Sequence, residues 1–336
     1  MKTDRRINLL RRIIKQQLTK RITSDYVYLD LPYYQNIGDL LIWSGTEHFL
    51  STLPYRCLYR SSCDNFDQRP LSPDVVIVMQ GGGNFGDLWS IHQDFRLKII
   101  ENYPDNRIVI LPQTVYYEDE RLFDRDAAVM RKHRHLTICA RDRRSYRMLK
   151  EHDVASDIIV LPDMAFCIPD EVIGRWRKMK AAKEKVLFVK RGDKELADSY
   201  DYERFITKDS PCEVHDWPSY ECFDDDVLNG FWHHKKASSV ERLNDYAREV
   251  YLPYMLDWGA SFLAGYKHIY TTRLHVAILS MLMRCPVIVF DNSYGKNSAF
   301  FETWMTGLDL VSLAGRRISV WRQMKDYLWM RQQLSE

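Results

Sequence analysis

Short apolar runs alternate with helix-forming stretches along the first half of the chain. Tyr26–Leu31 is apolar enough to form a buried strand, and Leu40–Leu53 has the character of a helix that follows it. Similar runs, each bounded by turn-forming residues, are Val75–Met79, Arg107–Leu111, Leu136–Ala140 and Ile158–Leu161. Apolar runs of this length, separated by helices, are typical of a parallel sheet covered on both faces. The pattern therefore predicts an α/β domain.

A second series of the same kind occupies the rest of the chain, at Val186–Val189, Glu213–His215, His268–Thr272, Val287–Phe290 and Leu308–Leu313. At 336 residues the chain exceeds the size at which a single hydrophobic core usually stops growing. We therefore expect two α/β domains, residues 25–168 and 169–315, with the boundary near Pro169–Lys185. Residues 316–336 are predicted to form a C-terminal helix that packs at the domain junction.

Residues 209–239 interrupt the alternation and show no clean period. A long irregular segment inside a compact domain is usually functional or mobile. Asp224–Asp226 and His233–His234 could hold a metal ion, but adjacent residues on a loop rarely point at one ion. The other two interpretations are a solvated surface insertion and a loop that faces a sugar, with four aromatic residues as stacking candidates: Trp217, Tyr220, Phe231 and Trp232.

The N-terminal segment, residues 1–24, is basic and amphipathic. Ile7, Leu10 and Ile14 recur with the period of a helix, and Asp4 is the single acid among the first 22 residues. The bases are Lys2, Arg5, Arg6, Arg11, Arg12, Lys15, Lys20 and Arg21. Such a helix suits the surface of an anionic membrane, and it equally suits packing on the body of the protein with a solvated basic face.

Composition narrows the class of protein. With 46% hydrophobic and 13% aromatic residues, the chain can bury real cores. The seven scattered cysteines include no Cys-x-x-Cys, which argues for free thiols in a reducing compartment and against a structural zinc site. No apolar run is long enough to span a bilayer or to form a signal-peptide core. We expect a soluble, cytoplasmic protein without a nucleic-acid partner, since the net charge is only +2.

Two ionisable residues follow the predicted strand His268–Thr272. Arg273 and His275 stand where this strand leads into the apolar helix former Val276–Met283, the position at which open α/β sheets bind anions. A guanidinium offers forked donors to carboxylate or phosphate, and a histidine beside it can donate a hydrogen bond or move a proton. A structural turn with a salt-bridged arginine and a capping histidine is the commoner explanation of an isolated Arg-x-His, so the neighbouring motifs decide.

Polar and glycine-rich motifs also follow strands of the first half. Glycines in Gly81–Asp87 let backbone N–H groups approach a ligand, but neither a dinucleotide fingerprint nor a P-loop is complete there. Asp39 suits either a helix cap or a sugar contact. The binding candidates at these strand ends are Asn36, Asp39, Gly83, Asn84, Asp87 and Gln113.

In their order and spacing these motifs resemble those of the polysaccharide pyruvyl transferases. The resemblance covers residues 25–310 and rests on Asn36–Asp39, Gly81–Asp87, Arg273–His275, Asp291–Lys296 and Phe301–Trp304. It implies two Rossmann-like domains that face a cleft, as in GT-B-type enzymes. It also implies transfer of a pyruvyl group from phosphoenolpyruvate to a sugar of a bacterial surface polysaccharide or its lipid-linked precursor, with phosphate released. No cofactor and no metal ion are expected.

The resemblance also implies roles for individual residues. The donor-binding residues would be Arg191, Arg273, His275, Asn292 and Lys296, in the second domain. Catalysis would fall to His275, Arg273 and Asp39, and acceptor binding to Asn36, Asp39, Gly83, Asn84, Asp87 and Gln113, in the first domain. The acid that protonates the donor methylene is not identified by any motif.

Two other functions are compatible with the pattern. A nucleotide-sugar-dependent GT-B glycosyltransferase could bind a diphosphate with Arg191 and Arg273. A carbohydrate-binding protein without catalysis is the third possibility, but pure sugar binding does not need paired arginines. The donor that raises the melting temperature, phosphoenolpyruvate or a nucleotide sugar, separates the two enzymes.

Overall fold

The computed structural model describes residues 3–179, 185–197, 202, 212–222, 224–316 and 318–334. The chain forms two compact units. Unit 1 comprises Met1–Leu10, Tyr34–Ser44 and Ile168–Glu336, and unit 2 comprises Arg11–Tyr33 and Gly45–Cys167. Two helices, α1 (Thr3–Thr19) and α2 (Ile37–Ser51), contribute residues to both units. The segment 34–44, which we expected within the first domain, thus belongs to the same unit as the second sheet.

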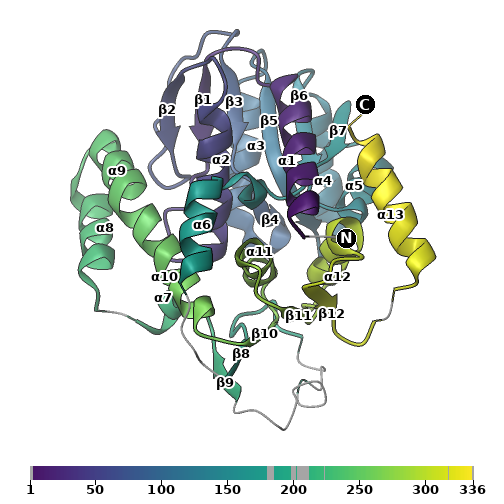
Figure 1. The fold of residues 1–336 in the computed structure, drawn as a ribbon. Coiled ribbons are helices and arrows are strands. Elements are labelled where there is room, and N and C mark those ends of the chain that lie inside the picture. Colours follow the sequence, from purple (N-terminus) through teal and green to yellow (C-terminus); the bar gives the residue numbers. More distant parts are fainter. Residues whose placement is uncertain are drawn as a thin grey trace. The chain divides into compact units, whose positions relative to one another are not determined.

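Unit 2 is built on a parallel sheet whose strand order is β2-β1-β3-β5-β6-β7, with β4 paired to β5 (Figure 1). Every residue of β1, β3 and β6 is buried, as expected for strands covered on both faces. The strands are β1 (Tyr26–Leu29), β2 (Cys57–Ser61), β3 (Val76–Met79), β4 (Gly82–Gly86), β5 (Ile108–Tyr116), β6 (Leu136–Ala140) and β7 (Asp157–Val160). Its helices include α3 (Ser90–Asn102), α4 (Glu120–Arg131) and α5 (Arg143–Glu151).

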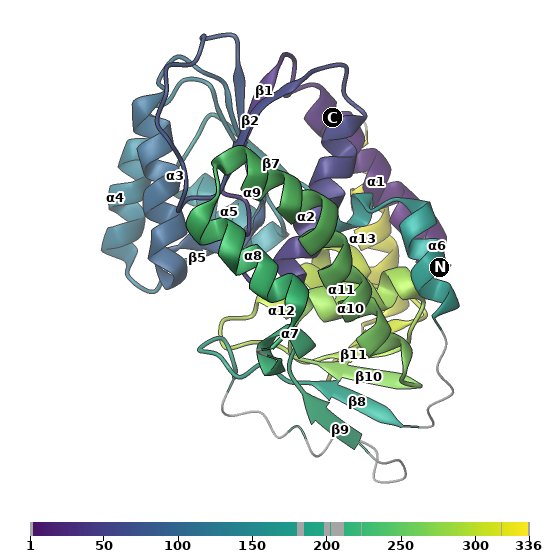
Figure 2. The same cartoon turned by 90° about the vertical axis from the view of Figure 1, so that its left-hand side faces the viewer.

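Unit 1 contains a second parallel sheet, of order β12-β11-β10-β8-β9. Its strands are β8 (Val186–Val189), β9 (Cys212–His215), β10 (His268–Thr271), β11 (Val287–Val289) and β12 (Val311–Leu313). Figure 2 shows α10 (Leu252–Ala264) and α11 (Leu274–Met283) beside these strands. Nine of the ten residues of α11 are buried, which explains its unbroken apolar sequence. The predicted α/β class with two Rossmann-like halves, as in GT-B-type folds, is confirmed.

Each sheet contains a point at which the order of its strands reverses. In unit 2 the chain passes from β1 to β2 on one side and then continues through β3 and β5 on the other. In unit 1 it passes from β8 to β9 and then continues through β10, β11 and β12 on the other side. Ligands of open parallel sheets bind outside the carboxyl ends of the strands at this reversal. The topology therefore marks two places, at the ends of β1 and β3 and at the ends of β8 and β10.

The segment 209–239 differs from expectation. Residues 209–211 and 223 lie outside the described residues, but the rest is mostly regular: β9, α7 (Pro218–Glu221) and α8 (Asp226–Ala237), followed by α9 (Val240–Tyr246). The Asp225 carboxylate caps α8 by accepting the N–H groups of Val227 and Leu228 at 2.9 and 3.0 Å. Our expectation of a long irregular segment was wrong, because α8 buries only Leu228 and Phe231 and so shows little apolar period.

The structure also limits which residues of the segment 209–239 could bind a sugar or a metal ion. Trp217 and Phe231 are fully buried and offer no face for stacking on a sugar, whereas Tyr220 and Trp232 are partly exposed. In the part of the chain that the structure describes, Asp224–Asp226 and His233–His234 form no group with metal-ligand spacing.

The apolar stripe of α1 belongs to the core. Ile7, Leu10 and Ile14 are buried, as are Ile13 and Leu18. Arg6, although charged, is buried too and donates to the carbonyl oxygens of residues 304 and 306 at 2.5 and 3.0 Å. A membrane contact through this helix would therefore depend on exposed bases such as Arg5, Arg12 and Lys15. Among the described residues, no helix combines the length and the apolar character needed to cross a membrane.

Candidate functional site

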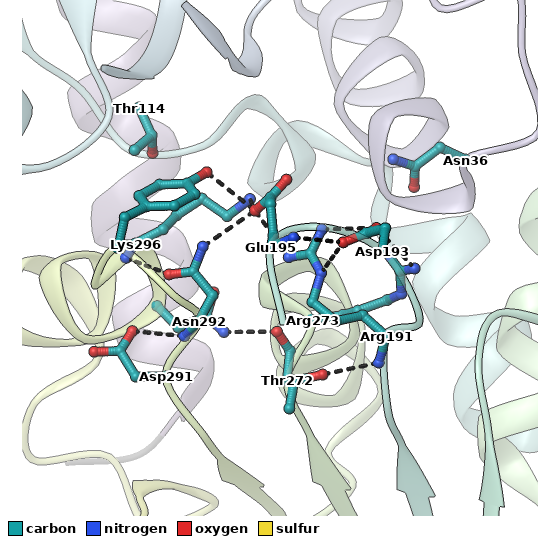
Figure 3. A network of polar contacts seen from close by, with 12 residues as sticks. Asn36, Thr114, Arg191, Asp193, Glu195, Thr272, Arg273, Asp291, Asn292 and Lys296 are labelled. Atoms are coloured by element: carbon teal, nitrogen blue, oxygen red, sulfur yellow. Dashed lines mark hydrogen bonds and ion pairs between the residues drawn. The ribbon is translucent and has the colours of Figure 1, made fainter. Parts of the chain in front are cut away.

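Two strands that flank the reversal in unit 1 end in arginines. Arg191 follows β8 by two residues, and Arg273 follows β10 and is the cap residue of α11 (Figure 3). The Thr272 hydroxyl accepts the backbone N–H of Arg191 at 2.9 Å and so joins the two strand ends. Both arginines are almost completely buried. The two guanidinium groups that the sequence pointed to thus lie at one edge of the sheet, beside the N-terminus of α11.

Both arginines are held by carboxylates. Arg191 donates to Asp193 with Nε and Nη2 at 2.7 and 3.0 Å, and Arg273 reaches the same carboxylate at 3.4 Å. Arg273 also forms a two-pronged pair with Asp216, at the end of β9, with one contact of 2.6 Å. Burial alone would raise the pKa of Asp193, but Arg191 and Arg273 outweigh it and hold the pKa below its usual range. Asp193 therefore stays ionised between the two arginines.

Glu195 is the centre of the neighbouring network. One of its oxygens, Oε2, accepts from Arg191 at 2.8 Å, Tyr294 at 3.0 Å, Asn292 at 3.1 Å and Lys296 at 2.5 Å (Figure 3). Burial raises the pKa of Glu195, but the charges of Lys296 and Arg191 outweigh it and bring the pKa well below its usual range. Glu195 thereby fixes the predicted donor residues Asn292 and Lys296 to Arg191.

The charges of the site balance. Among the described residues of this network, the cations Arg191, Arg273 and Lys296 pair with the carboxylates Asp193, Glu195 and Asp216. None of the sequence motifs pointed to these three carboxylates. Asp193 and Glu195 follow Arg191 by two and four residues, a charge alternation that could have been noticed, but Asp216 reaches Arg273 across 57 residues.

The motif at the start of α2 lies against His275. Asn36 caps α2, because its Oδ1 accepts the N–H of Gly38 at 2.9 Å. A Cβ at Gly38 would lie 2.6 Å from Nδ1 of His275, so only glycine allows this approach. Asp39 accepts from Asn36 at 2.7 Å and from Tyr34 at 3.1 Å. Asn36 and Asp39, which we expected on the acceptor side, therefore belong to the unit that carries the arginines.

The remaining candidates lie in unit 2. Oδ1 of Asn84 accepts from Gln113 and from Arg96, both at 3.1 Å, and Gly83 beside it is half-buried. Asp87 instead fastens a loop, since its carboxylate accepts backbone N–H groups of residues 118 and 119 at 2.8 Å. Asn84, in the middle of β4, and Gln113, inside the neighbouring strand β5, are thus brought together, whereas the contacts of Asp87 are with backbone groups of a loop.

Comparison with known proteins identifies the family. The sequence profile described as "Polysaccharide pyruvyl transferase" matches residues 36–294. The chain belongs to the polysaccharide pyruvyl transferase family. EpsO of Bacillus subtilis (strain 168), which carries the name of a pyruvyl transferase, is 35% identical over 86% of this chain and 88% of its own length. Pyruvyl transferase 1 of Schizosaccharomyces pombe is 26% identical over 85% of this chain and 71% of its own length.

One solved structure shares the fold of this pyruvyl transferase family member. A functionally uncharacterised protein of Klebsiella pneumoniae aligns with a TM-score of 0.62 at 20% sequence identity, over 91% of this chain and 99% of its own. At this identity the likeness concerns the fold alone. The family profile includes both arginine-bearing strand ends and the motif at the start of α2.

Proposed function

We propose that this protein transfers a pyruvyl group from phosphoenolpyruvate to a sugar of a bacterial surface polysaccharide or of its lipid-linked precursor, forming a pyruvate ketal and releasing phosphate. Membership of the family supports pyruvyl transfer to a polysaccharide. The observation that carries the choice of donor is the gathering of Arg191, Arg273 and Lys296 at one sheet edge. Phosphoenolpyruvate bears a phosphate and a carboxylate close together, and forked guanidinium groups suit both.

The proposed reaction moves protons as well as the pyruvyl group. The donor methylene gains one proton and becomes the methyl group, and the carbon that bore the phosphate is attacked by two sugar hydroxyls. Each hydroxyl loses its proton: one replaces the proton given to the methylene, and the other is taken up by the departing phosphate, which leaves as hydrogen phosphate. Charge develops on the departing phosphate, which arginines and a helix N-terminus can stabilise.

Individual residues have distinct parts in this proposal. Arg191, Arg273, Asn292 and Lys296 bind the anionic groups of the donor, and His275, in the first turn of α11, contacts the phosphate or delivers a proton. The cations of this network already pair with carboxylates. The phosphate and carboxylate of the donor would therefore replace some of these carboxylates as partners of the cations. No cofactor is part of the proposal.

The same proposal extends to the acceptor and the compartment. Asp39 orients or deprotonates an acceptor hydroxyl, and Asn36, Gly83, Asn84 and Gln113 bind the acceptor. All seven cysteines are free thiols, in keeping with a cytoplasmic enzyme.

Phosphate release tests the proposal. The protein is incubated with phosphoenolpyruvate and a panel of nucleotide-linked, lipid-linked and polymeric sugars, and a transferred product is sought by mass spectrometry. Acceptor-dependent phosphate release with a pyruvylated product is expected. Stabilisation by a nucleotide sugar but not by phosphoenolpyruvate in thermal unfolding would contradict it and favour a glycosyltransferase.

A further inference from the structure

A second polar network lies in unit 2, at the reversal between β1 and β3. Asp30 follows β1 directly, and its φ of 65° is in the left-handed region that non-glycine residues rarely adopt. Its side chain is completely buried. Backbone strain of this kind persists where the surrounding structure enforces it, and such sites are often functional. The strained position holds a carboxylate at the place where an open sheet binds ligands.

Asp30 holds His92 of α3. Nδ1 of His92 lies 2.7 Å from an oxygen of Asp30, and Sγ of Cys63 lies 3.9 Å from the same nitrogen. The Asp30 carboxylate and the Cys63 thiol both contact Nδ1 of His92. In a catalytic triad the acid and the nucleophile contact opposite ring nitrogens of the histidine, so these three residues do not form one. Burial lowers the pKa of His92, but the Asp30 carboxylate outweighs it and raises the pKa to about 10. His92 is therefore a cation at neutral pH and acts as a donor.

Like His92, Asn84 is oriented by buried polar side chains. Its Oδ1 accepts from two buried side chains, Arg96 and Gln113, so its amide nitrogen is the group available to a ligand. His92 and Asn84 are partly exposed, whereas Asp30, Arg96 and Gln113 behind them are buried. Two donors at the edge of the sheet are thus oriented by side chains that solvent does not reach.

The network has unused hydrogen-bonding capacity. Within the described part of the chain, three of its buried atoms have no hydrogen-bond partner: Oδ2 of Asp30, Nε of Arg96 and Oε1 of Gln113. A metal ion at Asp30, Cys63 and His92 would meet the geometry, since their ligand atoms lie within 4.8 Å of one another. The guanidinium of Arg96, 3.7 Å from Asp30, opposes a divalent cation there. Hydroxyl groups, which both donate and accept, suit this mixture of donors and acceptors better.

We infer that His92 binds a hydroxyl of the sugar acceptor together with Asn84, and that Asp30 is a positioning residue for His92. This inference rests on the proposed function, because it adds His92 and Asp30 of unit 2 to the residues proposed there for the acceptor. The acceptor then meets donors fixed before it binds, which reduces the entropy lost on binding.

The test uses two variants that exchange an ionisable side chain for a neutral amide, and a control in the same unit. With the acceptor found by phosphate release, His92→Gln and Asp30→Asn should each raise the acceptor KM about tenfold or more while the calorimetric affinity for phosphoenolpyruvate stays unchanged. His133, which is buried in unit 2 and bonds to the carbonyl of Tyr103 at 3.0 Å, provides the control. His133→Gln should change stability but not the acceptor KM.

A pH profile separates positioning from a merely structural role. In the wild type, the acceptor KM should rise as the pH approaches 10, where His92 loses its proton. In Asp30→Asn the rise should come at lower pH, since the carboxylate that holds the proton is gone. An unchanged acceptor KM in both variants would overturn the inference alone, and absence of transfer by the wild type would overturn the proposed function with it. If the purified wild type contains one zinc ion per chain and His92→Gln contains none, these residues form a metal centre and the inference is overturned.

An independent observation concerns the C-terminal helix α13 (Val320–Gln332) of unit 1. Four large apolar side chains stand on its solvent side: Val320, Trp321, Met324 and Leu328 are 71, 65, 60 and 57% exposed. Its opposite side is anchored, because Met330 is buried. An apolar face of this extent on one helix indicates a contact with something outside the described structure.

The charged residues around the apolar face of α13 indicate what kind of partner it contacts. Arg322, Lys325 and Arg331 are exposed, and Asp326, the one acid in the sequence of α13, is buried. Arg322 pairs with Asp326 at 3.4 Å, so the positive charge of the exposed face comes mainly from Lys325 and Arg331. Nζ of Lys325 lies 3.7 Å from the ring centroid of Trp321, so base and aromatic ring form one surface. We propose that this face of α13 binds an anionic lipid surface, into which apolar side chains insert while the bases meet the headgroups. A second copy would bring like charges together.

Sedimentation with vesicles tests this surface directly. The full chain should sediment with phosphatidylcholine vesicles that contain phosphatidylglycerol, less at high salt, and not with phosphatidylcholine alone. Trp321→Ser with Leu328→Ser should abolish sedimentation, and the control Arg5→Gln with Arg12→Gln on α1 should retain most of it. Equal sedimentation of the α13 variant, or none of the wild type, would overturn the proposal. A dimer of the wild type that the α13 variant loses would identify a second copy as the occupant.

Discussion

At the scale of single residues, the candidate donor site consists of cations that are already paired. Arg273 contacts Asp216 and Asp193, and Arg191 contacts Asp193 and Glu195. A buried ion pair contributes little net stability, but removal of one partner leaves an uncompensated charge. Substitutions in this network should therefore change both donor binding and folding, and each experiment must measure the two separately.

Loss of either arginine should weaken donor binding. We expect Arg273→Ala and Arg191→Ala to lower the affinity for phosphoenolpyruvate by about tenfold or more, because charge-assisted hydrogen bonds to the donor are lost. Isothermal calorimetry on the folded fraction measures the change. Arg284, an exposed arginine at the other end of α11 that pairs with Asp4, serves as the matched control. Unchanged affinity in both site variants would contradict a shared donor site.

Glu195 should give unit 1 a specific acid sensitivity. Folding lowers the pKa of Glu195. Its contribution to the free energy of unfolding is therefore complete above the ordinary glutamate pKa of about 4.3, and it is lost as the pH falls from there toward the pKa of the folded state. Glu195→Gln should cost about 3–5 kcal/mol at neutral pH, since Arg191 and Lys296 lose their shared partner. Urea unfolding from pH 7 to pH 3 should show a smaller loss of stability in the variant. Parallel curves would refute the linkage.

His275 should matter more for turnover than for stability. His275→Ala removes the imidazole from the first turn of α11, so kcat should fall while the melting temperature changes little. Gly38→Ala offers a second route to the same side chain, because its Cβ would meet Nδ1 of His275 at 2.6 Å. A lower melting temperature with normal turnover in the folded fraction of His275→Ala would assign this residue to packing.

At the scale of elements, α1 and α13 differ in what covers their apolar residues. The basic α1 has a regular apolar stripe, yet that stripe is buried, and Arg6 is buried with it. The stripe of α13 is less regular, yet four of its large apolar residues are exposed: Val320, Trp321, Met324 and Leu328. The spacing of apolar residues shows that a helix has one apolar and one polar face. It does not show whether the protein core or an outside partner covers the apolar face.

Removal of residues 1–22 should therefore prevent folding. Five large apolar side chains of α1 are buried, and each contributes about 1.5–3 kcal/mol, a sum comparable to the whole net stability of a typical domain. Circular dichroism and thermal unfolding of the truncated chain measure the effect. A truncated protein that unfolds cooperatively at the wild-type temperature would show that α1 is dispensable for the fold.

At the scale of the whole molecule, the two units repeat one architectural rule. Each has a parallel sheet whose order reverses once, and in each the polar network lies at the strand ends beside that reversal. The network of unit 1 contains three paired cations, whereas that of unit 2 presents His92 and Asn84 from a buried polar support. The forked guanidinium groups of unit 1 suit the anionic groups of the proposed donor, and the N–H donors of His92 and Asn84 suit hydroxyl groups of the proposed acceptor.

The sequence alone determined the elements whose signal is local. Strands such as Leu136–Ala140 and Val186–Val189 are short, almost entirely apolar and bounded by turns, so burial on both faces explains their existence. Arg191 and Arg273 could be placed at strand ends for the same reason. Strands β2 and β4 were missed, since β2 is only partly buried and β4 is rich in glycine.

Only the tertiary structure decided which distant residues meet. Asp216 reaches Arg273 across 57 residues and Asp30 reaches His92 across 62, and no local period encodes either pair. The association of Gly38 with His275 likewise arises because the start of α2 packs in unit 1. Local pattern depends on the neighbours of a residue along the chain, whereas the partners of a buried charge are chosen by the packing of whole elements.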